Sequence, residues 1–156
     1  VWARVHDRSS TQANEAEAEL AAGLVEACLA GGVPPSEVAV VAPFRRQVAL
    51  IRRLLDRRLG KLPEELVVDT VERVQGLTVD VIVLSMTASQ PDYVQSVAGF
   101  LLSANRLNVS VSRARRKAVI ISSPEVVSVL PQDYQSLVDR DVLRSLLEEA
   151  FVVDVI

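Results

Sequence analysis

The feature that most constrains the fold of this chain is the alternation of short apolar runs with segments of helical periodicity. Continuous apolar runs are typical of strands that are buried on both faces of a sheet, and they occur at residues 1–5, 37–42, 66–70, 79–86 and 117–122. Strands that alternate with helices favour a mainly parallel sheet covered by helices on both faces. We therefore expect an α/β fold with three layers.

Two helices are predicted between these runs. Asn14 is expected to cap a helix that extends to about Ala30, with Glu17 at the position from which a capping-box side chain bonds back to the cap. A second helix is expected over residues 44–59, where Val48, Ile51, Leu54 and Leu55 recur at helical spacing. We further expect a loop at residues 87–99 and a closing helix at residues 141–151.

Length and composition limit the possible classes of protein. The 156 residues suit one domain spanning 1–156, and the hydrophobic share of 49% is that of an ordinary globular chain. There is no apolar run long enough for a transmembrane helix and no signal-peptide pattern, so we expect no membrane association. A single cysteine, Cys28, excludes an internal disulfide and favours a cytoplasmic location.

Several kinds of catalytic site are not readable in this sequence. The phosphate-binding loop G-x-x-x-x-G-K-[ST] is missing, because Gly60 and Lys61 are followed by Leu62 and no glycine stands five residues before Gly60. The lone histidine, His6, has no partner at the spacing of a zinc site or a catalytic triad. We therefore expect no metal site in this chain and no independent binding of a nucleoside triphosphate.

One segment concentrates positive charge. Residues 106–117 hold five cationic side chains in a chain whose net charge is −3. If the segment is helical, Arg106, Ser110 and Arg113 share one stripe, because each residue turns the helix by about 100°. Asn108 and Arg115 would lie on a second polar stripe. Two polar faces could contact two polyanions, although a solvated basic helix has the same pattern.

Three segments that follow predicted strands, residues 42–47, 70–78 and 103–116, carry signature residues. Open α/β sheets bind ligands at the carboxyl ends of their strands. In order and spacing these segments resemble motifs IV, V and VI of the second RecA-like domain of superfamily one helicases, in the branch of the nonsense-mediated-decay and DNA-replication helicases. The matching residues are Thr11, Asn14, Glu17 and Ala18; Pro43, Phe44 and Gln47; Thr70, Val71, Gln75 and Gly76; Gly99, Phe100 and Leu101; and the run from Arg106 to Arg115.

The resemblance implies a RecA-like sandwich and a role for each signature. Arg113 aligns with the arginine finger, and Gln75, Gly76 and Arg106 align with residues that contact the nucleotide. ATP and Mg²⁺ would be bound mainly by a first RecA-like domain of the same chain. The residues implied to line a groove for single-stranded DNA or RNA are Pro43, Phe44, Gln47, Thr70, Val71 and Asn108.

The sequence also departs from the family pattern. Thr78 replaces the glutamate of motif V, Glu72 replaces its aspartate, and Ala42 replaces the threonine of motif IV. The motif that supplies an adenine-stacking aromatic residue is not found, so we expect the chain to be the C-terminal helicase domain of a longer enzyme, inactive when alone.

Two alternatives remain open at this stage. A noncatalytic nucleic-acid-binding or interaction module could retain the same fold. A flavodoxin-like enzyme for small ligands would need a glycine-rich first turn, and residues 5–14 contain no glycine.

Overall fold

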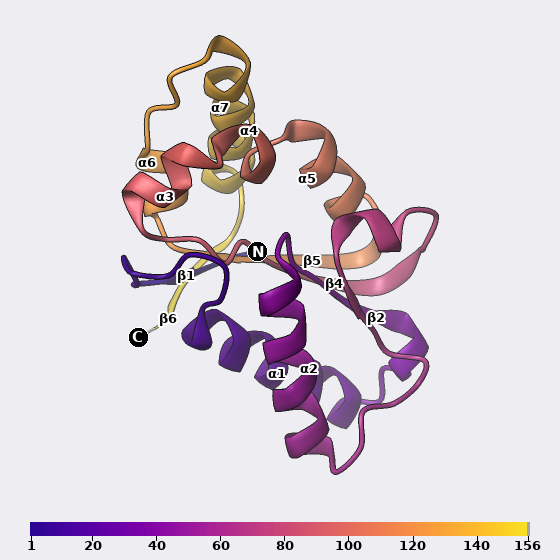
Figure 1. The fold of residues 1–156 in the computed structure, drawn as a ribbon. Coiled ribbons are helices and arrows are strands. Elements are labelled where there is room, and N and C mark those ends of the chain that lie inside the picture. Colours follow the sequence, from indigo (N-terminus) through magenta and orange to yellow (C-terminus); the bar gives the residue numbers. More distant parts are fainter. Residues whose placement is uncertain (156) are drawn as a thin grey trace.

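A computed structural model describes residues 1–155 and shows six strands in one sheet, all parallel. The strand order is β3-β2-β4-β5-β1-β6. This arrangement confirms the predicted α/β, RecA-like class with a parallel sheet (Figure 1). The strands are β1 (Trp2–Val5), β2 (Val38–Val41), β3 (Val67–Asp69), β4 (Val79–Ser85), β5 (Ala114–Ser122) and β6 (Val152–Val155).

Helices cover both faces of the sheet. Figure 1 shows α1 and α2 on one face, and α3 to α7 on the other. The α-helices are α1 (Glu15–Ala30), α2 (Arg45–Leu59), α3 (Pro91–Ser96), α4 (Ala98–Leu101), α5 (Ala104–Val111), α6 (Glu125–Ser128) and α7 (Tyr134–Glu148), and two short 3₁₀ helices are η1 (Pro35–Glu37) and η2 (Val71–Val74).

Each face of the sheet has its own core. Residues of α1 and α2, such as Val25 and Ile51, pack on one face, and residues of α5 and α7, such as Leu107 and Leu143, pack on the other. Both cores are almost entirely aliphatic, with Trp2 as the one aromatic residue that is buried among those the structure describes. The two cores fix the strand ends, where the predicted site lies.

The start of α1 is confirmed, but the role of Glu17 is not. The Asn14 side chain caps the helix by accepting a hydrogen bond from the Glu17 backbone N–H at 3.0 Å. The backbone N–H of Asn14 donates to Gln47 instead of to Glu17. The expected capping box is therefore wrong, because the Glu17 carboxylate turns inward under the end of β4.

The basic segment 106–117 is not one helix. Helix α5 ends at Val111, Ser112 and Arg113 form a turn, and β5 begins at Ala114. The expected helical stripes that joined Arg106 to Arg113 and Asn108 to Arg115 are therefore wrong. The physical reason is topological: β4 and β5 are parallel neighbours, so the chain must return to the starting edge of the sheet before β5 can begin.

Two other expectations need correction. Residues 87–99, expected as a loop, contain α3 and the start of α4, since Gln90 caps α3 through its side chain and Pro91 occupies the first turn. The closing helix begins earlier than expected, at Tyr134, because Asp133 caps it through the Ser136 backbone N–H. Strand β6 was not predicted, and it pairs with β1 at the edge of the sheet.

Candidate nucleotide and nucleic-acid site

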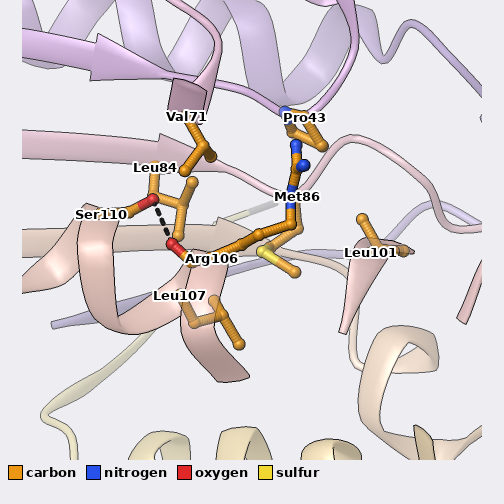
Figure 2. A pocket seen from close by; sticks show the side chains of 8 residues that line it. All are labelled: Pro43, Val71, Leu84, Met86, Leu101, Arg106, Leu107 and Ser110. Carbon is orange, nitrogen blue, oxygen red and sulfur yellow. Dashed lines mark hydrogen bonds between the residues drawn. The ribbon is translucent and has the colours of Figure 1, made fainter. Parts of the chain in front are cut away.

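A small pocket forms where β2 and β4 end and α5 begins. Pro43 follows β2, Met86 follows β4, and Arg106 lies in the first turn of α5. Figure 2 shows the Arg106 side chain extending past Met86 towards Pro43. The structure thus brings together Pro43 and Val71, predicted to contact nucleic acid, and Arg106, predicted to contact a nucleotide. The complete lining is Pro43, Val71, Leu84, Met86, Leu101, Arg106, Leu107 and Ser110.

Arg106 is held from two sides. One of its guanidinium nitrogens, Nη1, donates to the Glu72 carboxylate on η2, and the guanidinium carbon lies 4.0 Å from the centroid of the Phe100 ring. Partial burial opposes ionisation of Glu72, but hydrogen bonding to its own backbone N–H and the Arg106 charge together keep the Glu72 pKa below its ordinary value. The other terminal nitrogen, Nη2, is buried and has no partner among the described residues.

Gln75 and Gly76 form an exposed turn before β4. Gly76 has φ +83°, which an L side chain rarely adopts, and a Cβ built there would meet nothing within 4 Å. The glycine is therefore required by the backbone conformation and not by crowding. The exposed Gln75 side chain and the open space at Gly76 leave this turn accessible to a ligand.

Arg113 lies at the opposite edge of the sheet from Arg106. Its carbonyl oxygen accepts a hydrogen bond from the Val79 backbone N–H, at the start of β4, at 3.0 Å. Only Arg106 is thus at the carboxyl edge that we expected for both residues, since α5 runs back towards the starting edge. The Arg113 side chain is half-buried, and its Nε is buried with no partner among residues 1–155.

The next two arginines have structural partners. Arg115 donates to Asp80 and to Glu37, and Arg116 lies 3.7 Å from the other Asp80 oxygen. These ion pairs tie β5 to β4 and η1 at the starting edge of the sheet. Arg113 is thus the arginine of this run whose side chain makes no ion pair within the part of the chain described here.

Two of the residues predicted for the nucleic-acid groove, Phe44 and Thr70, lie partly exposed near Pro43. Phe44 is the cap residue of α2, and its ring contacts the rings of Tyr93 and Phe100, with centroids 6.1 and 5.6 Å away. Thr70 follows β3, and its backbone N–H donates to Asp69. A half-buried aromatic ring, a threonine and a proline thus lie together at one edge.

The other three predicted groove residues are placed less favourably for contact. Gln47 is fully buried, and its amide group bonds to the Asn14 backbone and to Ser85. The Val71 side chain is buried beneath η2. Asn108 is exposed but lines a groove between α5 and α7, on a different side of α5 from the Arg106 pocket. Direct contact through the Gln47 side chain does not fit this geometry.

A buried polar cluster lies beside the site, at the end of β4. The Oε2 atom of the Glu17 carboxyl group accepts hydrogen bonds from the Ser85 hydroxyl at 2.6 Å and from the Thr87 backbone N–H at 2.8 Å. Thr87 has φ +72°, an unusual conformation for a β-branched residue, and these bonds help to hold it. Asn14 and Gln47 complete the cluster through bonds to Thr87 and Ser85.

Two carboxyl groups near this cluster have shifted pKa values in opposite directions. Burial raises the pKa of Glu17 to about 8, although hydrogen bonds from Ser85 and Thr87 partly oppose the shift. Burial also acts to raise the pKa of Asp7, but hydrogen bonds from Ser10, Ser89 and Ser9 outweigh it and hold the pKa at about 2. Glu17 is therefore substantially protonated near neutral pH, whereas Asp7 is charged.

Sequence reasoning did not assign functional roles to Phe100 or Glu72, and it gave Glu17 only a capping role. Phe100 was part of a matched motif, and an aromatic residue in an aromatic-poor chain was a usable signal. The contact between Glu72 and Arg106 joins residues 34 positions apart, so no local pattern indicated it. The burial of Glu17 was suggested by its alanine neighbours on α1, which were assigned to a helix but not to a buried face.

The described residues contain no group of three or more His, Cys, Asp or Glu side chains arranged to hold a metal ion. Within the same residues, no helix has the length and apolar character needed to cross a membrane.

Comparisons with known proteins identify the family. A family described as "AAA domain" matches residues 3–125. "DNA polymerase alpha-associated DNA helicase A" of Schizosaccharomyces pombe is 31% identical over 93% of this chain. "Regulator of nonsense transcripts 1 homolog" of Arabidopsis thaliana is 37% identical over 76% of the chain, and "DNA replication ATP-dependent helicase/nuclease DNA2" of Homo sapiens is 30% identical over 76%.

The aligned region is a small part of each of these relatives. It spans 20% of the S. pombe protein, 9% of the A. thaliana protein and 11% of the human protein. The parallel sheet, the motifs at its edges and these similarities agree with one another. The chain therefore belongs to this AAA-domain family and corresponds to the C-terminal RecA-like domain of superfamily one helicases, in the branch of the nonsense-transcript and DNA-replication helicases.

Proposed function

We propose that this domain is the C-terminal half of the motor of an ATP-dependent helicase or translocase that moves on single-stranded nucleic acid. The observation that carries the proposal is a pair of buried guanidinium N–H groups that have no hydrogen-bond partner among residues 1–155, Arg106 Nη2 and Arg113 Nε, at the two ends of the motif VI segment. A buried donor without a partner costs about 1–3 kcal/mol, so a ligand that accepts from these two groups would be stabilised.

In this proposal, ATP and Mg²⁺ are bound mainly by a first RecA-like domain, and this domain closes over the nucleotide. The residues fit that role because Arg113 has a buried donor without a partner among residues 1–155 and because the turn at Gly76, at the same edge of the sheet, is open. Mg²⁺ would neutralise phosphate charge during transfer. Arg113 would supply its planar guanidinium to the γ-phosphate, and Gln75 and Gly76, which precede β4 at the same edge of the sheet, would contact the rest of the nucleotide. Arg106, implied by the motifs to contact the nucleotide as well, lies at the opposite edge.

The single strand would contact the adjacent edge of the sheet. Pro43, Phe44 and Thr70 lie there, and the exposed Arg45 and Arg46 follow directly in the first turn of α2. A helix favours acidic residues in its first turn, because the N-terminus carries partial positive charge. Two arginines at this position are locally unfavourable, which is consistent with a polyanionic partner. Hydrolysis would open and close the two domains and so move the strand.

The chain of 156 residues should have no ATPase activity above that of a mock preparation, with or without single-stranded DNA or RNA. The reason is that it lacks a phosphate-binding loop. Phosphate release should be measured with this chain alone and with a protein that also contains a first RecA-like domain. Hydrolysis by the chain alone would contradict the two-domain proposal, and inactivity of both proteins would favour a noncatalytic module.

The same chain should bind single strands weakly, and its affinity should fall as salt rises. Only one wall of the groove is present, and phosphate contacts release counterions, so the slope of log K against log salt should be negative. Fluorescence anisotropy of labelled oligonucleotides between about 50 and 200 mM salt would measure this slope. Tight, sequence-selective binding to duplex DNA would contradict the proposal.

A further inference from the structure

Aromatic residues are few in this chain and gather at one place. The sequence contains six, and three of them, Phe44, Tyr93 and Phe100, form one cluster. They come from the start of α2, from α3 and from α4, so the cluster forms only in the folded domain. The cores are built almost without aromatic residues. Phe44 and Tyr93 pack half-buried against the core on the side of α5 and α7, whereas Phe100 reaches further into solvent.

Phe100 is the most exposed ring of the cluster. The residue is 40% exposed, whereas Phe44 and Tyr93 are partly buried. The Arg106 guanidinium lies over the Phe100 ring, 4.0 Å from its centroid, and the Phe44 ring packs against it at a tilt of 45°. These contacts fix the ring while much of the residue still faces solvent. A rigid, partly exposed aromatic ring loses little entropy when a flat ligand stacks on it.

We propose that Phe100, supported by Phe44 and Tyr93, is a stacking platform for unpaired bases of the nucleic acid. This inference rests on the proposed function and deepens it, because it assigns the base contact to Phe100, a residue outside the groove set implied by the motifs. Every base has a π-face, so stacking on such a ring binds single strands with little sequence preference. Arg45 and Arg46, next to Phe44, supply positive charge for the flanking phosphates.

The platform is also connected to the predicted nucleotide contacts. Arg106 packs on the Phe100 ring and bonds to Glu72 on η2, the segment that leads to Gln75 and Gly76. A base that stacks on Phe100 would thus contact the ring that holds Arg106 in place. The Phe100 side chain thus contacts both the site for the nucleic-acid base and the Arg106 guanidinium.

The test compares two strands that carry the same phosphates. A labelled ten-nucleotide oligothymidylate and an abasic strand of equal length are titrated with the 156-residue chain at low salt, by fluorescence anisotropy. The wild type should bind oligothymidylate more tightly. Phe100→Ala and Phe100→Leu should weaken oligothymidylate binding by roughly tenfold, the usual effect of removing one stacking ring. Binding to the abasic strand should stay within about twofold, because it depends on phosphate contacts alone.

Two further variants serve as controls. Phe100→Tyr keeps an aromatic ring and should retain the preference for oligothymidylate. Tyr134→Ala removes an aromatic residue that is 81% exposed on α7, outside the cluster, and should change neither affinity. Phe100→Leu preserves the apolar packing, so its unfolding midpoint shows whether the loss arises from misfolding.

Each outcome separates this inference from the proposed function. Equal losses on both strands, or no loss with Phe100→Leu in a folded protein, would overturn the stacking platform while leaving single-strand binding intact. A wild-type chain that binds neither strand would contradict the proposed function itself.

Discussion

Arg113→Ala, introduced into a protein that contains both RecA-like domains, should lower the ATPase rate by roughly 10²- to 10⁴-fold, which corresponds to a few kcal/mol of barrier. The affinity for ATP should change much less. A guanidinium at the γ-phosphate stabilises charge that develops in the transition state more than charge that is already present in bound ATP. Steady-state hydrolysis and equilibrium binding of a non-hydrolysable ATP analogue would measure the two effects separately.

Two substitutions sharpen this prediction. Arg113→Lys should not restore activity, since an ammonium group cannot reproduce the planar fork of the guanidinium. Arg116→Ala is the matched control, because Arg116 is an exposed neighbour on β5 whose contact is an ion pair with Asp80 at 3.7 Å. If Arg113→Ala kept near wild-type hydrolysis and Arg116→Ala were inactive, the alignment of Arg113 with the arginine finger of motif VI would be wrong. If neither Arg113→Ala nor Arg116→Ala changed the ATPase rate, the basic segment would be only a solvated surface.

The secondary structure of the basic segment, residues 106–117, was the part of the fold that the sequence predicted least well. Its positive charge and its signature residues were recognised, but a single helix was expected where the structure has α5, a turn and β5. The spacing of Val109 and Val111 is compatible with a helix and with a strand, so the short-range periodicity could not distinguish the two structures. The pairing of β5 with β4 and β1 decides it, and that pairing joins residues far apart in sequence.

The strands and long helices were easier to predict, since their signals are local. The apolar run of β4 and the cap at Asn14 each lie within a few residues. The site was harder, because its contacts connect distant segments. Gln47 was assigned to a nucleic-acid surface from its motif, and only the folded chain shows its amide between Asn14 and Ser85. Sequence identified the residues, whereas the fold shows which of their side chains reach solvent.

The pocket shows what Glu72, the residue that departs from the motif V pattern, contacts in the folded chain. Glu72 replaces the aspartate of the family pattern, and in the structure it bonds to Arg106 instead of facing solvent alone. In this chain Glu72 therefore makes a contact between motifs V and VI. Since Arg106 also packs on Phe100, motif residues from three segments are joined around one guanidinium group. The site is better described as a connected arrangement than as a row of independent contacts.

The buried carboxyl group of Glu17 should make the stability of this domain depend on pH. Burial raises its pKa to about 8 in the folded state from the ordinary value of 4.5. A carboxyl group with a raised pKa favours folding when protonated, so this contribution is complete below about pH 4.5 and is lost as pH rises towards about 8. We expect the free energy of unfolding to fall across this window, by at most about 1.4 kcal/mol per pH unit.

Glu17→Gln should remove this dependence, because the amide resembles the protonated carboxyl group and cannot ionise. Urea unfolding of both proteins at pH 5, 6, 7 and 8 would measure the difference in slope, in which the titration of other groups cancels. Asp7, the charged neighbour, has a pKa of about 2 and stays ionised throughout this range, while Ser85, Thr87, Asn14 and Gln47 do not titrate. Glu15→Gln is the matched control, since Glu15 is exposed on the first turn of the same helix and should leave the slope unchanged. If wild type and Glu17→Gln had equal slopes between pH 5 and 8, the Glu17 carboxyl group would have to be ionised and solvated in the folded protein, and the buried cluster at the end of β4 could not exist as described.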